Sequence, residues 1–126
     1  MKAKLFQNKI VVKKSSMHGY GVFAEKTLKK GEIIEECYII LSKGGDKALE
    51  DFYFDVKSKY GIFTGFGIIY NHSDEPNADY HINVKRRLTT FKASRTIRKG
   101  EEILISYGDK WFSSRGWEAK HHDKKK

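Results

Sequence analysis

Short runs of β-branched and aromatic residues, separated by glycines and charged residues, make up most of the chain. Such runs favour strands, because branched and aromatic side chains pack well on a half-buried pleated surface. The segments that we expect to form strands are 9–15, 21–26, 28–36, 37–41, 60–71, 82–95 and 97–105. The pattern therefore predicts a mostly β protein of short strands with many non-local contacts.

One segment has an ambiguous pattern. Residues 46–56, DKALEDFYFDV, place apolar side chains at a spacing that suits a short helix, although FYFDV at 52–56 could equally be a strand. Long alternating helices are not indicated anywhere. We therefore expect few helices, all of them short.

Two distant segments echo each other, LKKGEIIEE at 28–36 and IRKGEEILI at 97–105. In each, a basic pair and a glycine lead into a run of Ile, Leu and Glu. Glycine supplies the turn conformation, so each segment reads as a turn that feeds a strand. The alternative explanation is that both segments use the same common type of turn, without any further relation. It still marks two strands at opposite ends of the chain.

Length and cysteine content narrow the class of protein. A chain of 126 residues is expected to form one domain with one core. The single cysteine, Cys37, excludes an internal disulfide and every zinc module that needs two thiolates from one chain, which favours a reducing, intracellular compartment. The first ten residues lack the apolar run of a signal peptide, and no stretch of eighteen apolar residues predicts a membrane span.

The formal net charge is +9, and part of it comes from the terminal KHHDKKK, which reads as a solvated or disordered tail. The rest of the chain stays basic without that tail. A basic balance is compatible with nucleic acid, chromatin or an acidic protein surface, and charge alone does not choose among them.

Two glycines flank a tyrosine in HGYGVFAE, the segment from His18 to Glu25. Gly19 and Gly21 allow the backbone to turn sharply and let a ligand approach main-chain amides that a Cβ would block. A hairpin turn before a strand is the alternative explanation. The GxGxxG pattern of a dinucleotide-binding turn is not present.

The segment YNHSDEPNADYH at 70–81 concentrates turn-forming residues directly behind an apolar run. Asn71 and His72 fall where that run passes into a surface loop. Such a strand end is a common place for a ligand site, because the scaffold holds it while the loop gives access. An Asx-type cap with a satisfied histidine is the alternative. A metal site is disfavoured, since His18, His72 and His81 share no helical spacing.

The segment EEILISYGDKWF at 101–112 ends its strand pattern in a tyrosine. Ile103 and Ile105 alternate on one face, and the strand then delivers Tyr107 beside a glycine. A core tyrosine with its hydroxyl at the rim is the alternative explanation.

In order and spacing, the motifs GYGVFA, NHSxxPN and GEEIxISYGD resemble the SET-domain family of protein lysine methyltransferases, especially the minimal type of large DNA viruses such as the chlorella viruses. The resemblance runs from about residue 9 to about residue 115. It implies the β-clip SET fold, with several small sheets, few short helices and a C-terminal pseudoknot that joins the Asn-His and Tyr-Gly segments. We therefore expect one SET domain over residues 1–117 and a basic tail over 118–126.

The resemblance implies S-adenosylmethionine as cofactor, S-adenosylhomocysteine as product, and no metal. No cysteine-rich segment follows the last motif, so the expected lid is the aromatic group Trp111, Phe112 and Trp117, with ordinary packing as the alternative for Trp117. The residues that the resemblance assigns to the cofactor are His18, Gly19, Tyr20, Gly21, Asn71, His72, Trp111 and Phe112.

The resemblance places Tyr107 at the methyl-transfer point, and Tyr80 where some members carry a tyrosine that limits the number of methyl groups. Phe52, Ile105 and Trp111 are the expected contacts of the substrate lysine. Phe52 departs from the viral type, which has a tyrosine in its lysine channel, and Ile105 is neither the Phe nor the Tyr of other members. The sequence therefore leaves mono-, di- and trimethylation open.

The implied function is methyl transfer to a lysine side chain of a protein, with a histone tail as substrate. The viral type also implies a homodimer, and the host nucleus as location if the source is a virus of eukaryotes. A catalytically silent SET-like module that holds a protein or chromatin partner is the alternative, although the retained motif residues favour activity. A small nucleic-acid-binding β protein is a third reading, based on charge and scattered aromatics, but the basic residues fall mainly in turns and in the tail.

Overall fold

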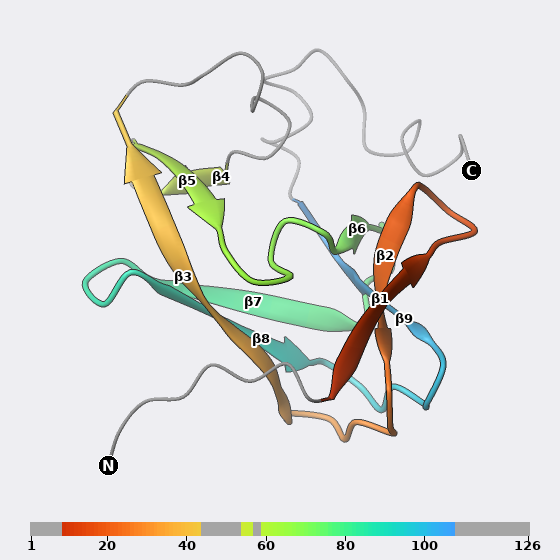
Figure 1. The fold of residues 1–126 in the computed structure, drawn as a ribbon. Coiled ribbons are helices and arrows are strands. Elements are labelled where there is room, and N and C mark those ends of the chain that lie inside the picture. Colours follow the sequence, from red (N-terminus) through yellow and green to blue (C-terminus); the bar gives the residue numbers. More distant parts are fainter. Residues whose placement is uncertain (1–8, 44–53, 57–58, 108–126) are drawn as a thin grey trace.

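Strands account for all the regular secondary structure in the described part of the chain. The computed structural model describes residues 9–43, 54–56 and 59–107 (Figure 1). The strands are β1 (Ile10–Lys14), β2 (Tyr20–Ala24), β3 (Ile33–Ser42), β4 (Phe54–Val56), β5 (Lys59–Phe63), β6 (Asn71–His72), β7 (Ala78–Asn83), β8 (Leu88–Ala93) and β9 (Glu102–Ile105). The prediction of a mostly β protein of short strands is confirmed.

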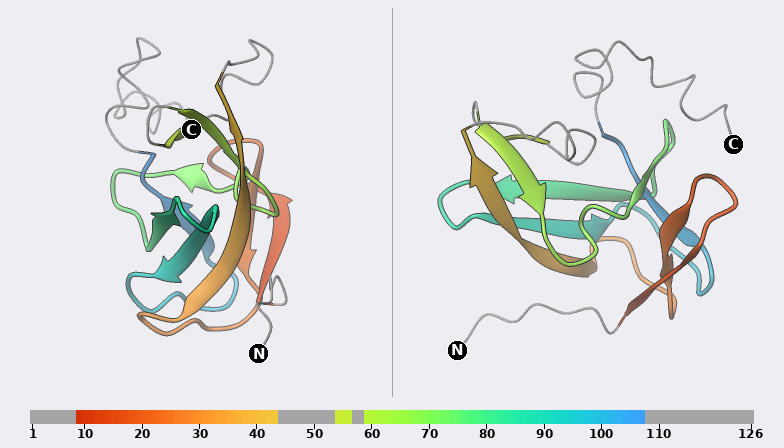
Figure 2. Two further views of the ribbon diagram at one scale, coloured as in Figure 1. Left: turned by 90° about the vertical axis from the view of Figure 1, so that its left-hand side faces the viewer. Right: turned by 45° about the horizontal axis from the view of Figure 1, so that its top comes forward.

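The strands form two small sheets, which Figure 2 shows from two further directions. One sheet has the order β1-β2-β9-β6, and the other has the order β4-β5-β3-β8-β7. Neighbours are antiparallel except β6 and β9, which pair in parallel. The β6–β9 pair joins two segments that lie about thirty residues apart in the chain.

The strand predicted over residues 60–71 is in fact two strands. β5 ends at Phe63, and the chain turns before β6 begins at Asn71. Gly65 has φ +65°, a left-handed conformation that cannot continue a strand, and the Gly67 N–H donates to the Thr64 carbonyl at 3.0 Å. The apolar run GFGIIY therefore folds as a turn that packs inward, which its composition did not indicate.

The observed boundaries of other strands also differ from the predicted ones. Residues 82–95 hold the end of β7, a turn and β8, because the Asn83 side chain accepts a hydrogen bond from the Arg86 N–H at 3.1 Å and Arg87 has φ +54°. The two segments 28–36 and 37–41 contribute to one strand, β3. In the ambiguous segment, Phe54–Val56 is strand β4, and residues 46–53 lie outside the described residues.

The two echoing segments lie against each other and are related by a local two-fold arrangement. Leu28 and Ile97, which occupy the same place in the echo, exchange backbone hydrogen bonds of 2.7 and 2.9 Å. The two glycines match as well: Gly31 N–H donates to the Ala93 carbonyl at 2.7 Å, and Gly100 N–H donates to the Ala24 carbonyl at 2.8 Å. The glycine bonds therefore extend the β3–β8 and β2–β9 pairs, each within its own sheet, and the Leu28–Ile97 pair joins the two turns that lead from one sheet to the other.

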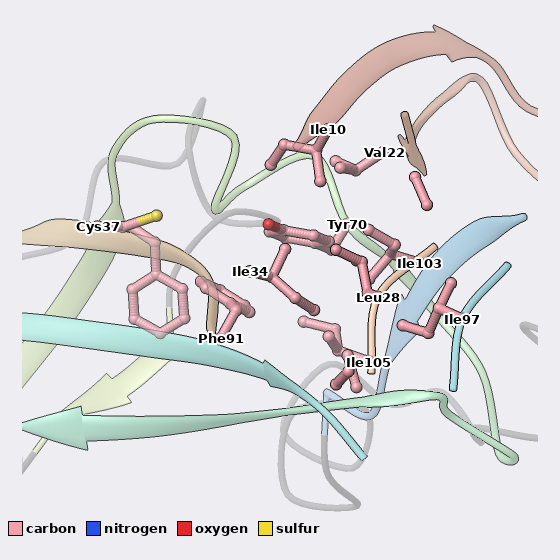
Figure 3. Close-up of a cluster of buried hydrophobic side chains, with 14 of the residues drawn as sticks. Ile10, Val22, Leu28, Ile34, Cys37, Tyr70, Phe91, Ile97, Ile103 and Ile105 are labelled. Carbon is pink, nitrogen blue, oxygen red and sulfur yellow. The ribbon is translucent and has the colours of Figure 1, made fainter. Parts of the chain in front are cut away.

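Side chains from both sheets meet in one core (Figure 3). Leu28, Ile97 and Tyr70 are all fully buried in it. The other core residues labelled in Figure 3 are Ile10, Val22, Ile34, Cys37, Phe91, Ile103 and Ile105. Within the described residues, no helix is long and apolar enough to cross a membrane.

We expect Leu28→Ala and Ile97→Ala each to lower the free energy of unfolding by about 2–5 kcal/mol, because each removes a fully buried side chain and leaves a cavity. Because the two residues are directly paired, we expect their effects to be non-additive. The loss of unfolding free energy in the double variant should differ from the sum of the two single losses by at least about 0.5 kcal/mol. Urea unfolding of the four proteins measures this. Strict additivity would contradict direct packing of the two turns.

Candidate functional site

The glycine-rich segment predicted to bind the cofactor forms an exposed turn between β1 and β2. The Ser15 N–H donates to the Gly19 carbonyl at 2.7 Å, and the Ser15 hydroxyl accepts the Met17 N–H at 2.9 Å. Gly19 has φ +49°, and a Cβ added there would meet nothing within 4 Å. The next side chain, Tyr20, is 63% exposed. The tip of this turn is therefore open to an approaching molecule.

The underside of this turn is fixed by the side chain of Asn71. Its Nδ2 lies 3.1 Å from the His18 carbonyl and 3.2 Å from the Tyr20 carbonyl. The same Nδ2 donates to the Glu102 carboxylate at 2.7 Å, and the Ser15 hydroxyl donates to the other carboxylate oxygen at 2.8 Å. Asn71 is buried, so this network sets the position of the turn from below.

The polar segment that begins at Asn71 uses its hydrogen-bonding groups against β9. The Asn77 side chain donates to the Glu102 carbonyl at 2.9 Å and accepts the Leu104 N–H at 2.8 Å. The Ser73 N–H donates to the Ile105 carbonyl at 2.9 Å. Buried backbone groups need partners, so a polar loop beside an apolar strand completes the sheet edge. The expected meeting of the Asn-His segment with the segment before Tyr107 is thus observed.

His72 and Tyr70 hold Tyr107 at its two ends. The Tyr107 N–H donates to His72 Nδ1 at 2.9 Å, and His72 Nε2 lies 3.1 Å from Asp74 Oδ1. Because Nδ1 accepts, the ring proton belongs on Nε2, where Asp74 can accept it. At the other end, the Tyr107 hydroxyl donates to the Tyr70 carbonyl at 2.6 Å. The phenol therefore has a fixed position, and its hydroxyl proton points to the Tyr70 carbonyl.

Aromatic rings surround the phenol of Tyr107. The ring of Phe54 meets it edge-on, with centroids 5.8 Å apart, and the His72 ring lies 5.2 Å away. Tyr80 packs against Phe54 at 5.9 Å. Burial raises the pKa of Tyr107 above its ordinary value, with Tyr80 and Glu102 adding to the shift, and burial also raises the pKa of Tyr80. Both hydroxyls therefore stay protonated at neutral pH.

A buried carboxylate lies behind this group. Glu35 is 1% exposed; it accepts the Tyr70 hydroxyl at 2.6 Å and the Phe66 N–H at 2.9 Å. Burial, and after it Glu35, raises the pKa of Tyr70. The Tyr70 ring also stacks on Phe91 at 4.4 Å. These contacts fix the residue whose carbonyl receives the Tyr107 hydroxyl.

The structure gathers most of the predicted site residues around β6 and the end of β9. Ile105 is fully buried in the core, and its contact with substrate stays a prediction. Phe52, Trp111, Phe112 and Trp117 lie outside the described residues, as does the chain beyond 107 that the pseudoknot would thread. Those brought together are His18, Gly19, Tyr20, Gly21, Asn71, His72, Tyr80 and Tyr107.

Sequence reasoning missed five residues that organise the site. Asn77 stood inside the quoted motif NHSxxPN, so the motif itself was a signal. An acid between isoleucines at Glu102 was a weaker signal, because one strand alone does not reveal the partner of a carboxylate. The five are Ser15, Glu35, Tyr70, Asn77 and Glu102. Among the described residues, no group of three or more His, Cys, Asp or Glu is arranged to hold a metal ion.

Comparison with known proteins identifies a family whose matching region includes both the glycine turn and Tyr107. The family model for the SET domain matches residues 19–108, from the glycine turn to just after Tyr107. The chain belongs to the SET-domain family. The predicted family is confirmed, and so is the predicted class of enzyme, protein lysine methyltransferase.

Two relatives of this SET domain carry histone methyltransferase names. A Schizosaccharomyces pombe protein named histone-lysine N-methyltransferase, H3 lysine-37 specific, is 25% identical over 121 residues, which is 89% of this chain and 82% of that protein. A crystal structure of a Plasmodium falciparum protein, provisionally assigned as a histone methyltransferase, has a TM-score of 0.70 and 40% identity and covers 79% of this chain and 93% of its own. The expected closeness to the viral type stays a prediction.

We expect Gly21→Ala to lower the free energy of unfolding by about 1–3 kcal/mol, because the added Cβ would collide with the Glu102 carboxylate and approach Asn71 Nδ2 to 3.0 Å. In a Glu102→Ala background the same change should cost less, since the colliding group is gone. Urea unfolding of the double-mutant cycle measures the difference. An equal cost in both backgrounds would place the strain elsewhere.

We expect stability to depend on the protonation of the buried tyrosines. Their folded pKa values are raised above the ordinary value of 10.0, so their contribution is complete below pH 10 and is lost as the pH rises further. Urea unfolding between about pH 8 and pH 11 measures this loss. Tyr107→Phe should show a shallower fall than the unaltered protein, and an identical fall would show that Tyr107 is not protected from ionisation.

Proposed function

We propose that this SET domain transfers a methyl group from S-adenosylmethionine to the side-chain amine of a lysine in a histone. The observation that supports the proposal is the fixed phenol of Tyr107, which is held by the Tyr70 carbonyl and by His72. Asn71, the neighbour of His72 in β6, holds the open glycine turn, so one short strand contacts both parts of the site. The histone target rests on the names of the two relatives. A nuclear location follows from a histone target, and a homodimer or a viral source stays a prediction.

The residues present fit the cofactor. The turn at His18–Gly21 offers main-chain groups at an exposed tip, and Gly19 leaves the space above it free. Asn71 holds the two carbonyls of that turn inward, so the turn keeps its shape without a ligand. When bound, S-adenosylmethionine supplies a methyl group on a sulfonium cation. Trp111 and Phe112 remain its proposed lid, outside the described residues.

The reaction needs a neutral lysine amine. A free lysine has a pKa of about 10.4, so at pH 7 the neutral form is about 4.6 kcal/mol less favourable than the ammonium. An aromatic, water-poor surrounding disfavours the charged form, and a nearby cation disfavours it further. Phe54, Tyr80 and His72 supply the aromatic surroundings of Tyr107. A dedicated general base is then unnecessary.

Tyr107 is suited to orient the amine and not to deprotonate it. Its hydroxyl proton is donated to the Tyr70 carbonyl, so the oxygen is left as an acceptor for an amine N–H. Its raised pKa keeps the tyrosinate form unpopulated at neutral pH. By accepting one N–H, the phenol turns the nitrogen lone pair toward the methyl donor, which is catalysis by orientation. Tyr80, in the same aromatic cluster, is proposed to limit the room for added methyl groups.

We expect Tyr107→Phe to lower the rate of methyl transfer by about 100-fold or more while the dissociation constant of S-adenosylmethionine changes less than about threefold, since the phenol acts on the amine. Mass spectrometry of a histone peptide panel measures transfer, and calorimetry measures cofactor binding. Tyr38→Phe is the matched control, because this tyrosine is 43% exposed on β3.

A fully active Tyr107→Phe enzyme would remove Tyr107 from this role. A protein that neither binds S-adenosylmethionine nor modifies any peptide would instead favour the catalytically silent binding module. Transfer to other lysine-rich proteins but not to histones would overturn the histone target and leave the chemistry in place.

A further inference from the structure

The two echoing turns, residues 25–32 and 94–101, bring many cations to one end of the molecule. The Leu28–Ile97 backbone pair holds the turns together, and Figures 1 and 2 show them side by side in every view. Both apolar side chains point into the core, so the charged neighbours of each face outward. We call the six exposed cations of these turns the basic corner: Lys26, Lys29, Lys30, Arg95, Arg98 and Lys99.

The charges of the basic corner are not neutralised by the acids beside them. Cations outnumber carboxylates two to one in the two turns. Glu32 forms an ion pair of 2.8 Å with Lys9, which is the first cause of its lowered pKa, and Glu101 accepts the Arg98 backbone N–H at 2.7 Å. Among the described residues, no ion pair includes any of the six cations. With Glu25 as the third carboxylate, the two turns keep a net charge of +3, so the corner is positively charged.

The chemistry of the basic corner favours phosphate over other anions. The two turns themselves contain no exposed large apolar side chain. Of the exposed large apolar residues on the described surface, Ile33 directly follows the first turn, and the others are Tyr20, Tyr38, Ile40, Tyr60 and Val84. A protein interface normally needs apolar or aromatic anchors, and single-stranded nucleic acid needs rings on which bases stack. A duplex backbone needs neither, because cations and small polar groups suffice. Exposed Thr27 and Thr96 add hydroxyl donors beside the cations.

We propose that the basic corner binds the phosphate backbone of duplex nucleic acid without regard to base sequence. The corner and the candidate active site lie at opposite ends of β9, a strand that spans about 13 Å, so one molecule can hold a duplex and a lysine at once. In combination with the proposed histone substrate, the corner would position the enzyme on DNA next to the tail it modifies. The binding itself does not depend on that function.

The test is binding of a fluorescently labelled duplex of about 20 base pairs, followed by anisotropy over a range of salt concentrations. The test variant is Lys29→Ala/Lys30→Ala/Arg98→Ala/Lys99→Ala in the full chain. The matched control removes the same charge from exposed positions far from the corner, as Lys14→Ala/Lys59→Ala/Lys85→Ala/Arg86→Ala. Circular dichroism and thermal unfolding verify that each variant folds. If the test variant does not fold, Lys30→Gln/Lys99→Gln replaces it.

We expect the test variant to bind the duplex about tenfold or more weakly at low salt, with the slope of log affinity against log salt reduced in magnitude by about 3, because each lost phosphate contact removes about 0.9. The control should keep a slope close to that of the unaltered protein. Equal losses in both variants, or no binding by the unaltered protein, would overturn the proposal. Equally tight, corner-dependent binding of poly-glutamate would assign the corner to an acidic protein instead.

Methylation of a free peptide separates this proposal from the proposed function. The test variant should methylate the peptide as the unaltered protein does, because its substitutions lie away from Tyr107. If the protein has no methyltransferase activity, the duplex-binding measurement still supports or overturns the proposal for the basic corner.

Discussion

The structure depends on the pairing of β9 along both of its edges. One edge is bonded to β2, and the other is bonded to β6 and to the side chain of Asn77. A four-residue strand cannot be stable alone, so its position is decided by these partners. The β6 contact fixes Asn71 and His72, and through them the glycine turn and Tyr107. The site is therefore a consequence of how this strand satisfies its backbone groups.

Buried polar side chains supply the rigidity that methyl transfer requires. Glu102 connects Ser15 with Asn71 below the turn, and Glu35 connects the Phe66 amide with the Tyr70 hydroxyl behind the phenol. Charged groups are costly to bury unless they are hydrogen-bonded, and here each carboxylate has at least two donors. Orientation is thus built into the folded chain before any substrate arrives.

The local two-fold relation gives the same pair of turns two consequences. Inside, Leu28 and Ile97 close the core between the two sheets. Outside, the residues beside them form the basic corner, because the shared sequence pattern places a basic pair before each glycine. Two turns of the same sequence pattern therefore form one continuous surface, the basic corner. The charge that the sequence spreads over distant segments is concentrated by the fold.

Much of the fold and of the site was predictable from the sequence, because both rest on local chemistry. Short runs of β-branched and aromatic residues predicted β1, β2 and β9, and glycines such as Gly19 and Gly100 indicated where the chain turns. Spacing of motifs identified Asn71, His72 and Tyr107. Only the tertiary structure decided that 60–71 breaks into two strands, that Glu35 is a buried carboxylate and Glu102 a half-buried one, and that two distant basic turns share one corner. The physical reason is that hydrogen-bond partners and charge neighbours far apart in the chain are chosen by strand pairing, which no local pattern encodes.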